Sequence, residues 1–323
     1  MLGVTVCASA FDPTAGDYSR EWPSDIRVLS YNVEGQLVSG TSTIQARFGR
    51  IINALDPDVI VFQEIADTLT ANQVAAQVMT LTGESGWTAH MGIGFGVRTV
   101  VASRFPLADT RTDTFPASST RGVTIARINL PDGTYDRDLY IMGVHLKCCN
   151  SVGNEDENRQ RSADAIAAWM GDARRAGGFY TLPNNTPMVV VGDFNLVGGP
   201  QPEQTLLTGN IQSESTYGPD VKGDWDNSNI TDLTPADPFT GTINTWPSTS
   251  AQQTSRLDRF LYTDSAVEIG ARGIVNPATM TSAVRTALGV QSTDASAAAD
   301  HLPIFADFRM GPAPSAGSLW TIR

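Results

Sequence analysis

Residues 188–196 read Met-Val-Val-Val-Gly-Asp-Phe-Asn-Leu and predict a strand that is buried on both faces. Four apolar residues in a row, bounded by Pro187 and Gly198, are typical of such a strand. Asp193 and Asn195 follow at a spacing of two, so their side chains leave the same side of an extended chain. A carboxylate and a carboxamide at a strand's end can form the floor of a polar site. The alternative is an Asx-rich turn that closes a core strand.

Other apolar runs that are predicted to be strands also meet polar side chains at their ends. Strand ends that converge on one edge of a layered sheet are where α/β proteins place their sites. We therefore expect these polar groups to come together in the fold. They are Asn32, Glu64, His145, Asp300 and His301, beside the predicted strands 26–33, 59–62, 139–146 and 302–308.

Each of these residues also has a plain structural explanation. Asn32 could cap a turn, Glu64 could be a surface carboxylate, and His145 could be a hydrogen-bonded core histidine. Asp258, which lies in the stretch Arg-Leu-Asp-Arg, could form a surface ion pair worth little energy. Asp300-His301 could cap the last strand. The shared placement at strand ends is what favours a common site over these separate explanations.

The remaining elements follow from hydrophobic periodicity. Residues 197–255 are rich in Gly, Ser, Thr, Asn, Asp and Pro, and we interpret them as the substrate rim. Arg159 and Arg161 lie near the start of a predicted helix, where a cation opposes the helix dipole, so we expect acidic partners to hold them. The predicted helices cover residues 44–55, 70–81, 155–175 and 279–288, and further predicted strands cover residues 97–103, 123–130, 256–262 and 267–275.

The chain of 323 residues is 41% hydrophobic and carries 22 basic and 34 acidic side chains, a net charge of −12. Its length suits one large α/β domain or two small ones, and no long linker is evident. We take residues 26–310 as one domain, with a lead-in at 1–25 and a tail at 311–323. So acidic a surface disfavours tight non-specific nucleic-acid binding, although a bound divalent metal would reverse the field locally.

The sequence also bears on location and on disulfides. No apolar run approaches the about 20 residues that a membrane span needs. A short apolar stretch and Ala8-Ser9-Ala10 suit at best a trimmed signal sequence, which leaves the location open between secreted or periplasmic and cytoplasmic.

Cys7, Cys148 and Cys149 do not form a disulfide framework, and adjacent cysteines pair only in a strained small ring. We therefore expect buried free thiols.

Short motifs at the predicted strand ends follow one another in a specific order. In chain order they are Tyr31-Asn32, Phe62-Gln63-Glu64, Val144-His145-Leu146, Gly192-Asp193-Phe194-Asn195, Arg256-Leu257-Asp258 and Asp300-His301-Leu302-Pro303-Ile304. This order resembles the endonuclease/exonuclease/phosphatase superfamily, which includes pancreatic-type deoxyribonucleases, abasic-site endonucleases, neutral sphingomyelinases and inositol-polyphosphate phosphatases. The resemblance spans residues 26–308, nearly the whole chain.

The resemblance implies an α/β fold of a particular kind. It is a four-layered α/β sandwich, in which two mixed β-sheets pack face to face with helices on the outside. By resemblance, Glu64 binds the catalytic divalent metal, Asn32 assists the metal or the phosphate, and Asp300 is a further carboxylate around the metal. The ion is expected to be Mg²⁺, with Mn²⁺ or Ca²⁺ as alternatives, because hard oxygen ligands select these ions over zinc.

The resemblance also implies the roles of five catalytic residues. Asp193 orients or deprotonates the attacking water, and Asn195 positions the water or the phosphate. His301 contacts the phosphoryl oxygens, with Asp258 fixing its tautomer. His145 resembles the histidine of the deoxyribonuclease and sphingomyelinase branches, where it protonates the leaving oxygen or stabilises the transition state.

Two basic residues flank the predicted site strands. Arg121 and Lys147 are therefore candidate phosphate contacts. The chain departs from the family pattern at Ala299, where many members carry a small hydroxyl residue. The leading hypothesis is a metal-dependent phosphoesterase in which water attacks a phosphodiester or phosphomonoester in line.

The substrate class stays open between a small molecule, a lipid head group and nucleic acid. A nuclease needs a positive groove, which the acidic balance disfavours. A sphingomyelinase-like lipid hydrolase needs an exposed apolar loop, for which Trp225 and Trp246 are candidates. A catalytically silent binding module is the alternative of another class, disfavoured because every catalytic position is filled. No obligate protein partner is indicated.

Overall fold

Strand β1 lies near the middle of the first of two six-stranded sheets, whose order is β11-β12-β1-β2-β4-β3. All eight residues of β1 are buried, including the polar residues Asp25, Arg27, Ser30 and Asn32. β1 and β2 run parallel, and the other pairs in this sheet are antiparallel. The strands are β1 (Asp25–Asn32), β2 (Val59–Ala66), β3 (Thr88–Met91), β4 (Val97–Ser103), β11 (Glu268–Ile274) and β12 (Ile304–Arg309).

The second sheet has the order β5-β6-β7-β8-β10-β9. Its parallel pair is β7 and β8, and its other pairs are antiparallel. The six residues of β8 are all buried, as residues 188–196 predicted. The strands are β5 (Leu107–Asp113), β6 (Val123–Ile128), β7 (Leu139–His145), β8 (Met188–Asp193), β9 (Thr231–Leu233) and β10 (Asp258–Tyr262).

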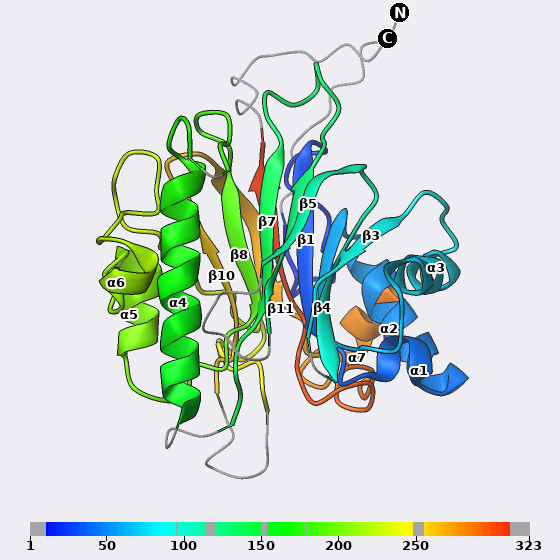
Figure 1. The fold of residues 1–323 in the computed structure, drawn as a ribbon. Helices are drawn as coiled ribbons and strands as arrows, with labels where there is room; N and C mark the ends of the chain where they lie inside the picture. Colours follow the sequence, from blue (N-terminus) through cyan, green and yellow to red (C-terminus); the bar gives the residue numbers. More distant parts are fainter. Residues whose placement is uncertain are drawn as a thin grey trace, which may run out of the picture.

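The two sheets pack face to face, and helices cover the outer faces (Figure 1). The sheets approach so closely at Gly143 of β7 that a Cβ atom there would lie 2.9 Å from the side chain of Val61. Helices α1 (Gln36–Ser39), α2 (Ser42–Leu55), α3 (Ala71–Thr82) and α7 (Ser282–Leu288) lie on the side of the first sheet, and α4 (Asn154–Ala173), α5 (Gln201–Thr208) and α6 (Glu214–Tyr217) on the side of the second. The predicted four-layered α/β sandwich is confirmed.

Local signals set the ends of the helices that cover the first sheet. The Thr41 side chain accepts a hydrogen bond from the backbone of Ile44 and begins α2, and Asp56 ends it in the left-handed conformation. Between these caps, Phe48 and its apolar neighbours form one buried stripe. A capping box between Thr70 and Gln73 begins α3 in the same way.

The arginines near the start of α4 have the acidic partners that the sequence predicted. Arg159 is fully buried and contacts Asp156 at 3.1 Å between Nη2 and Oδ1. Arg161 pairs with Glu157 one turn away. Three acidic residues in the first turn offset the two cations at the positive end of the helix dipole.

The structure is a computed structural model that describes residues 11–94, 96–113, 121–149, 154–178, 180–247 and 255–310. The predicted signal-like residues Ala8-Ser9-Ala10, Cys7 and the tail at 311–323 lie outside these ranges. Within them, no helix combines the length and the apolar character that crossing a bilayer requires.

Candidate active site

Glu64 reaches the site through an irregularity in β2. The pairing of β2 with β4 shifts register between Phe62 and Ile65, and Glu64 itself has a positive φ of 59°. The bulge frees the Glu64 side chain from the alternation of the strand. Its carboxylate Oε1 accepts a hydrogen bond from Asn32 Nδ2 at 3.1 Å, so the ends of β1 and β2 meet here.

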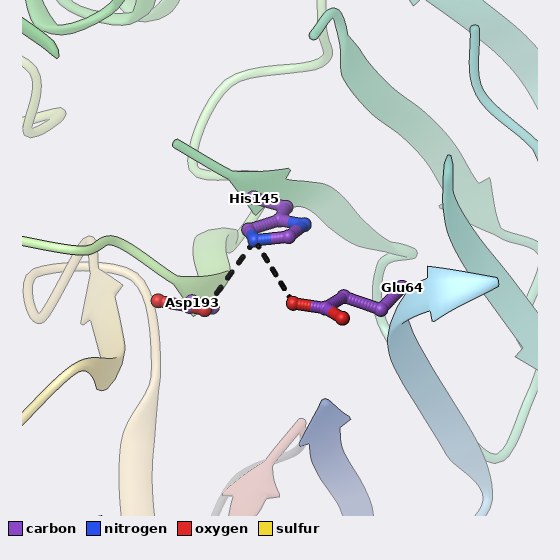
Figure 2. Close-up of side chains that lie close together, drawn as sticks. All are labelled: Glu64, His145 and Asp193. Atoms are coloured by element: carbon purple, nitrogen blue, oxygen red, sulfur yellow. Dashed lines mark ion pairs between the residues drawn. The ribbon is translucent and has the colours of Figure 1, made fainter. Parts of the chain in front are cut away.

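Glu64, His145 and Asp193 form a compact group of three potential metal ligands. Each offers one ligand atom, and these atoms lie within 4.8 Å of one another. His145 Nε2 lies 3.7 Å from Glu64 Oε1 and 3.5 Å from Asp193 Oδ2 (Figure 2). The parallel register of β7 and β8 pairs His145 with Asp193, which is why two strand ends present them together.

A second histidine approaches the same carboxylate oxygen of Asp193. His301 Nε2 lies 3.7 Å from Asp193 Oδ2, and His301 Nδ1 lies 2.7 Å from Asp258 Oδ2. Asp258 is the first residue of β10 and pairs with Asp193 across the sheet. The Thr245 hydroxyl accepts hydrogen bonds from the backbone amides of Leu257 and Asp258 and holds the start of β10 in place.

The two histidines have opposite electrostatics. Burial lowers the pKa of His145 well below 6.5, and the nearby charges of Arg121, His301 and Lys147 add to this effect. Burial also disfavours the charged form of His301, but Asp258 and Asp193 outweigh it and raise the pKa of His301 to about 10. At neutral pH His145 is therefore a neutral imidazole and His301 an imidazolium.

Asp193 lies between these two histidines and is itself perturbed. It is fully buried, and this desolvation raises its pKa to about 7 despite the opposing charge of His301. Asn32 Nδ2 donates to Asp193 Oδ2 at 3.1 Å, and the backbone amide of Asn195 donates to Oδ1 at 3.0 Å. A carboxylate with such a pKa can take up or release a proton near neutral pH.

The two asparagines contact the site as hydrogen-bond donors. Asn32 donates to both Glu64 and Asp193, while its Oδ1 accepts from the backbone amide of Glu34. In this arrangement Asn32 orients the two carboxylates and does not turn its oxygen toward them. Asn195 Nδ2 donates to the carbonyl oxygen of Leu146 at 3.2 Å, which ties the loop after β8 to the loop after β7.

Asp300 lies at the margin of the site. It is outside the group of three potential metal ligands found among the described residues, and its Oδ2 accepts a hydrogen bond from Trp246 Nε1 at 3.3 Å. Its charge helps to raise the pKa of His301, so it lies near that ring.

Glu34 joins the site although the sequence did not single it out. Burial, Asp300 and Glu64 raise its pKa, which places its carboxylate near both acids. Glu34 follows Asn32 at the same spacing of two that separates Asp193 from Asn195, so the strand-end pattern could have identified it.

Of the two tryptophans that were candidates for an exposed apolar loop, only one lies at the site. The Trp246 ring stacks on the His301 ring with centroids 6.4 Å apart. Trp225 donates from Nε1 to the carbonyl of Thr186, just before β8 begins, whereas the site is at the end of that strand. The structure thus removes Trp225 from the substrate rim.

Both predicted phosphate contacts lie beside the site. Burial lowers the pKa of the Arg121 guanidinium, and the charges of Asp193 and Glu64 act against this effect. Arg121 Nη1 donates to the Leu146 carbonyl at 2.9 Å. Lys147 Nζ lies 4.0 Å from Glu155 Oε1, and its charge contributes to the low pKa of His145.

The expectation of free thiols at positions 148 and 149 was wrong. Cys148 and Cys149 form a disulfide with each other directly after the strand that ends at His145. Cys148 is half-buried and Cys149 is exposed, so neither has the buried position that was expected. The backbone accommodates the small ring with a φ of 99° at Cys149.

The residues present fit a divalent metal ion. Two carboxylates and a neutral imidazole nitrogen converge within bonding reach of one centre. Ionised Asp193 is disfavoured by its burial, and a bound cation would offset that cost. This mixed oxygen and nitrogen donor set differs from the all-oxygen set that the sequence suggested, because His145 points at the same place as the carboxylates.

Comparisons with known proteins agree with this geometry. Residues 29–296 match the profile described as Endonuclease/Exonuclease/phosphatase family. Among solved structures, D. rerio TDP2 complexed with single-strand DNA product is 17% identical, with a TM-score of 0.55 over 88% of this chain and 99% of that one. A search of curated proteins found no match.

Two bacterial structures described as endonuclease/exonuclease/phosphatase proteins are similar to the same degree. The protein from Bacteroides vulgatus is 16% identical, with a TM-score of 0.56 over 89% of this chain and 99% of that one. The protein from Beutenbergia cavernae is 16% identical, with a TM-score of 0.55 over 92% of this chain and 74% of that one. At such identities the structures establish a shared fold, whereas the profile match covers most of the sequence. The chain belongs to the endonuclease/exonuclease/phosphatase family of metal-dependent phosphoesterases.

Proposed function

We propose that this protein hydrolyses a phosphodiester bond by in-line attack of water. The observation that carries the proposal is the position of Asp193 between two histidines of opposite charge state. Asp193 Oδ2 lies 3.5 Å from neutral His145 and 3.7 Å from the imidazolium of His301. A proton acceptor beside a fixed cation is what attack of water on a phosphate ester requires.

Asp193 and His301 divide the chemistry between them. Asp193 orients the attacking water and takes its proton. His301 stays protonated because Asp258 holds its Nδ1, and its Nε2–H donates to the phosphoryl oxygens as charge develops on them. Asn195 keeps Asp193 in place through its backbone amide.

Glu64, His145 and Asp193 would hold the divalent metal, and Asn32 keeps the two carboxylates oriented. When bound, the ion supplies positive charge to the phosphoryl group and to the leaving oxygen. We propose Mg²⁺ or Mn²⁺, and the imidazole nitrogen favours Mn²⁺ over Ca²⁺. In this arrangement His145 is a ligand in its neutral form, and Asp300 supports His301 from the side.

Arg121 and Lys147 would bind the non-reacting phosphate oxygens. Both lie next to the loop that follows His145, and both contribute positive charge at the site of a chain whose net charge is −12. A phosphate ester is therefore attracted locally, although the surface as a whole repels it.

Nucleic acid is the second candidate substrate class, favoured by the fold shared with TDP2, whose structure holds a single-strand DNA product. The Trp246 ring beside His301 offers a flat surface on which a base could stack. The acidic charge of the chain argues for short or single-stranded substrates over long duplexes.

A panel of phosphate esters tests the proposal. It contains bis-p-nitrophenyl phosphate, p-nitrophenyl phosphate, an oligonucleotide, sphingomyelin and inositol phosphates, each with Mg²⁺, Mn²⁺, Ca²⁺ or a chelator. We expect diester hydrolysis that the chelator abolishes. His301→Ala should lower the rate by roughly 10² to 10³, the usual cost of losing one stabilising donor.

Arg121→Ala and Arg137→Ala form a matched pair for the same assay. Arg137 donates to the Asn185 carbonyl before β8, at the opposite end of that strand from the site. The first change should raise KM and the second should leave it unchanged. Failure to hydrolyse every ester with every metal would instead support a binding module without catalysis.

A further inference from the structure

The Cys148–Cys149 disulfide lies at the margin of the site, and the proposed hydrolysis does not use it. It follows His145 within four residues and joins two neighbours in the sequence. It therefore closes almost no loop of the unfolded chain. The loss of unfolded-chain entropy, through which disulfides mainly stabilise a fold, is accordingly small here. Cys149 is an exposed residue, and exposed disulfides are the ones that react with thiols.

The residues just before the disulfide are tied firmly to the site. The Leu146 carbonyl accepts from Arg121 Nη1 and Asn195 Nδ2, and the Leu146 amide donates to the Asp193 carbonyl at 2.9 Å. The Lys147 carbonyl accepts from Arg159 Nη1 at 2.8 Å. The backbone is thus anchored up to position 147, and the disulfide ring is the next constraint along the chain.

The ring contains a residue whose backbone conformation is disfavoured for an open chain. Cys149 has a φ of 99°, which L side chains rarely adopt. Opening the ring lets residues 148 and 149 relax, and Lys147 is the adjoining residue whose side chain is partly exposed beside the site. The disulfide thus directly follows one predicted phosphate contact in the chain.

We propose that Cys148–Cys149 is a thiol–disulfide exchange site whose oxidised form holds Lys147 in position for the phosphate. This inference rests on the proposed function for the role of Lys147. The reactant is a dithiol of the kind that reduces exposed protein disulfides. This proposal makes the Cys148–Cys149 pair a modification site just beyond the end of β7.

The exchange balances as a two-electron reaction. A thiolate of the reductant attacks the exposed Cys149 sulfur, the bond between Cys148 and Cys149 breaks, and Cys148 leaves as a thiolate that takes up a proton. The second thiol of the reductant then displaces Cys149 and closes the reductant's own disulfide. The protein gains two electrons and two protons, and the dithiol loses the same.

The test uses the full chain with Cys7→Ser, so that positions 148 and 149 are the only cysteines. The protein is equilibrated in oxidised and in reduced dithiothreitol and then alkylated, and its mass reports how many thiols have reacted. The KM and kcat for bis-p-nitrophenyl phosphate are measured in both states. Affinity for inorganic phosphate is measured by calorimetry in both states.

We expect reversible gain of two alkylated thiols and a roughly twofold to fivefold rise in KM on reduction, the value of one partly exposed charge contact. The kcat should change much less, because His301 and Asp193 are untouched. The Cys148→Ala, Cys149→Ala double variant should show the KM of the reduced form in both buffers. Lys147→Met should have a raised KM that no longer responds to the reductant.

Three outcomes overturn the inference. The first is a disulfide that resists reduction in the folded protein, and the second is a reduced form with unchanged KM and phosphate affinity. The third is a redox response that persists in Lys147→Met. Absence of hydrolysis in both states would count against the proposed function alone, since phosphate calorimetry still decides whether reduction weakens binding.

Discussion

The two ends of β1 differ in the partners that surround a buried acid. Near its start, Arg27 and Asp307 form a buried two-pronged pair, with Nε–Oδ1 at 2.6 Å and Nη2–Oδ2 at 2.7 Å. The remaining Arg27 donor satisfies the backbone carbonyls of Tyr18 and Leu55. Burial raises the pKa of Asp307, and the hydrogen bonds and charge of Arg27 oppose that effect, so an arginine within the protein compensates this acid directly.

Beyond the end of β1, the hydrogen bonds to the buried acid Asp193 within the described residues come from amides. Its side chain accepts from Asn32 Nδ2 and from the backbone amide of Asn195, and the imidazolium of His301 lies 3.7 Å away. Glu64 and neutral His145 add no positive charge. The difference teaches that one buried acid is paired directly with an arginine, whereas the buried acid at the site is held by amides and imidazoles at a place where a bound cation would offset its charge.

Changing one buried charged residue at each end of β1 should separate effects on activity from effects on stability. The change at the site should have the largest effect. We expect Asp193→Asn to lower hydrolysis of bis-p-nitrophenyl phosphate by roughly 10² to 10⁴, because the proton acceptor is lost. Its free energy of unfolding should stay the same or rise, since burial of this carboxylate already disfavours its charge. Initial rates and urea denaturation measure the two effects, and a strongly destabilised Asp193→Asn protein would contradict the comparison.

At the start of β1, a change should lower stability and leave activity nearly unchanged. Arg27→Met leaves Asp307 buried without its partner, which typically costs about 3–5 kcal/mol. Urea denaturation should show this loss, while the kcat of the protein that remains folded should be nearly unchanged. Arg161→Met is the control, because its ion pair with Glu157 is exposed and worth little.

A divalent ion should stabilise the folded protein through the site residues and not through the Arg27–Asp307 pair. At about 100 times its Kd, an ion that binds the folded state alone adds about 2.7 kcal/mol, which raises the melting temperature by a few degrees. Thermal melts with Mn²⁺ and with chelator measure this difference. Glu64→Gln should reduce it strongly and Asp307→Asn should not. Equal stabilisation of wild type and Glu64→Gln would place the metal elsewhere.

The last prediction concerns the dependence of stability on pH in chelator. The pKa of His301 rises from 6.5 to about 10 on folding, so its protonation favours the folded state. That contribution is fully present below pH 6.5 and is lost as the pH rises toward 10. The free energy of unfolding should fall over this range more steeply for wild type than for His301→Gln. Parallel curves would show that Asp258 and Asp193 do not hold the charge.

The long apolar strands and amphipathic helices were predictable because their patterns are local. The predicted strand at 97–103 coincides with β4, and the predicted helices at 44–55 and 70–81 match α2 and α3 to within two residues. Short elements such as β3 and α5 were not predicted, since few residues carry each pattern and pairing with neighbours stabilises them.

Within the site too, features that depend on local sequence could be predicted, whereas features that depend on distant partners could not. Asn32, Glu64, Asp193 and His301 could be proposed from strand ends and motif order, and the structure brings them together. Trp225 could not be separated from Trp246, because only the distant partner Thr186 shows on which side of the fold it lies. The disulfide escaped prediction, since its formation depends on the backbone conformation at Cys149.

The sequence by itself determined which segments are buried, where each strand ends and which polar residues stand at those ends, because these properties depend on neighbours along the chain. Only the tertiary structure decided that His145 shares its centre with Glu64 and Asp193, and that His301 is charged while His145 is neutral. Ligand geometry and pKa depend on atoms a few ångströms away in space, and those atoms come from residues that are far apart in the sequence, such as Asp193 and His301.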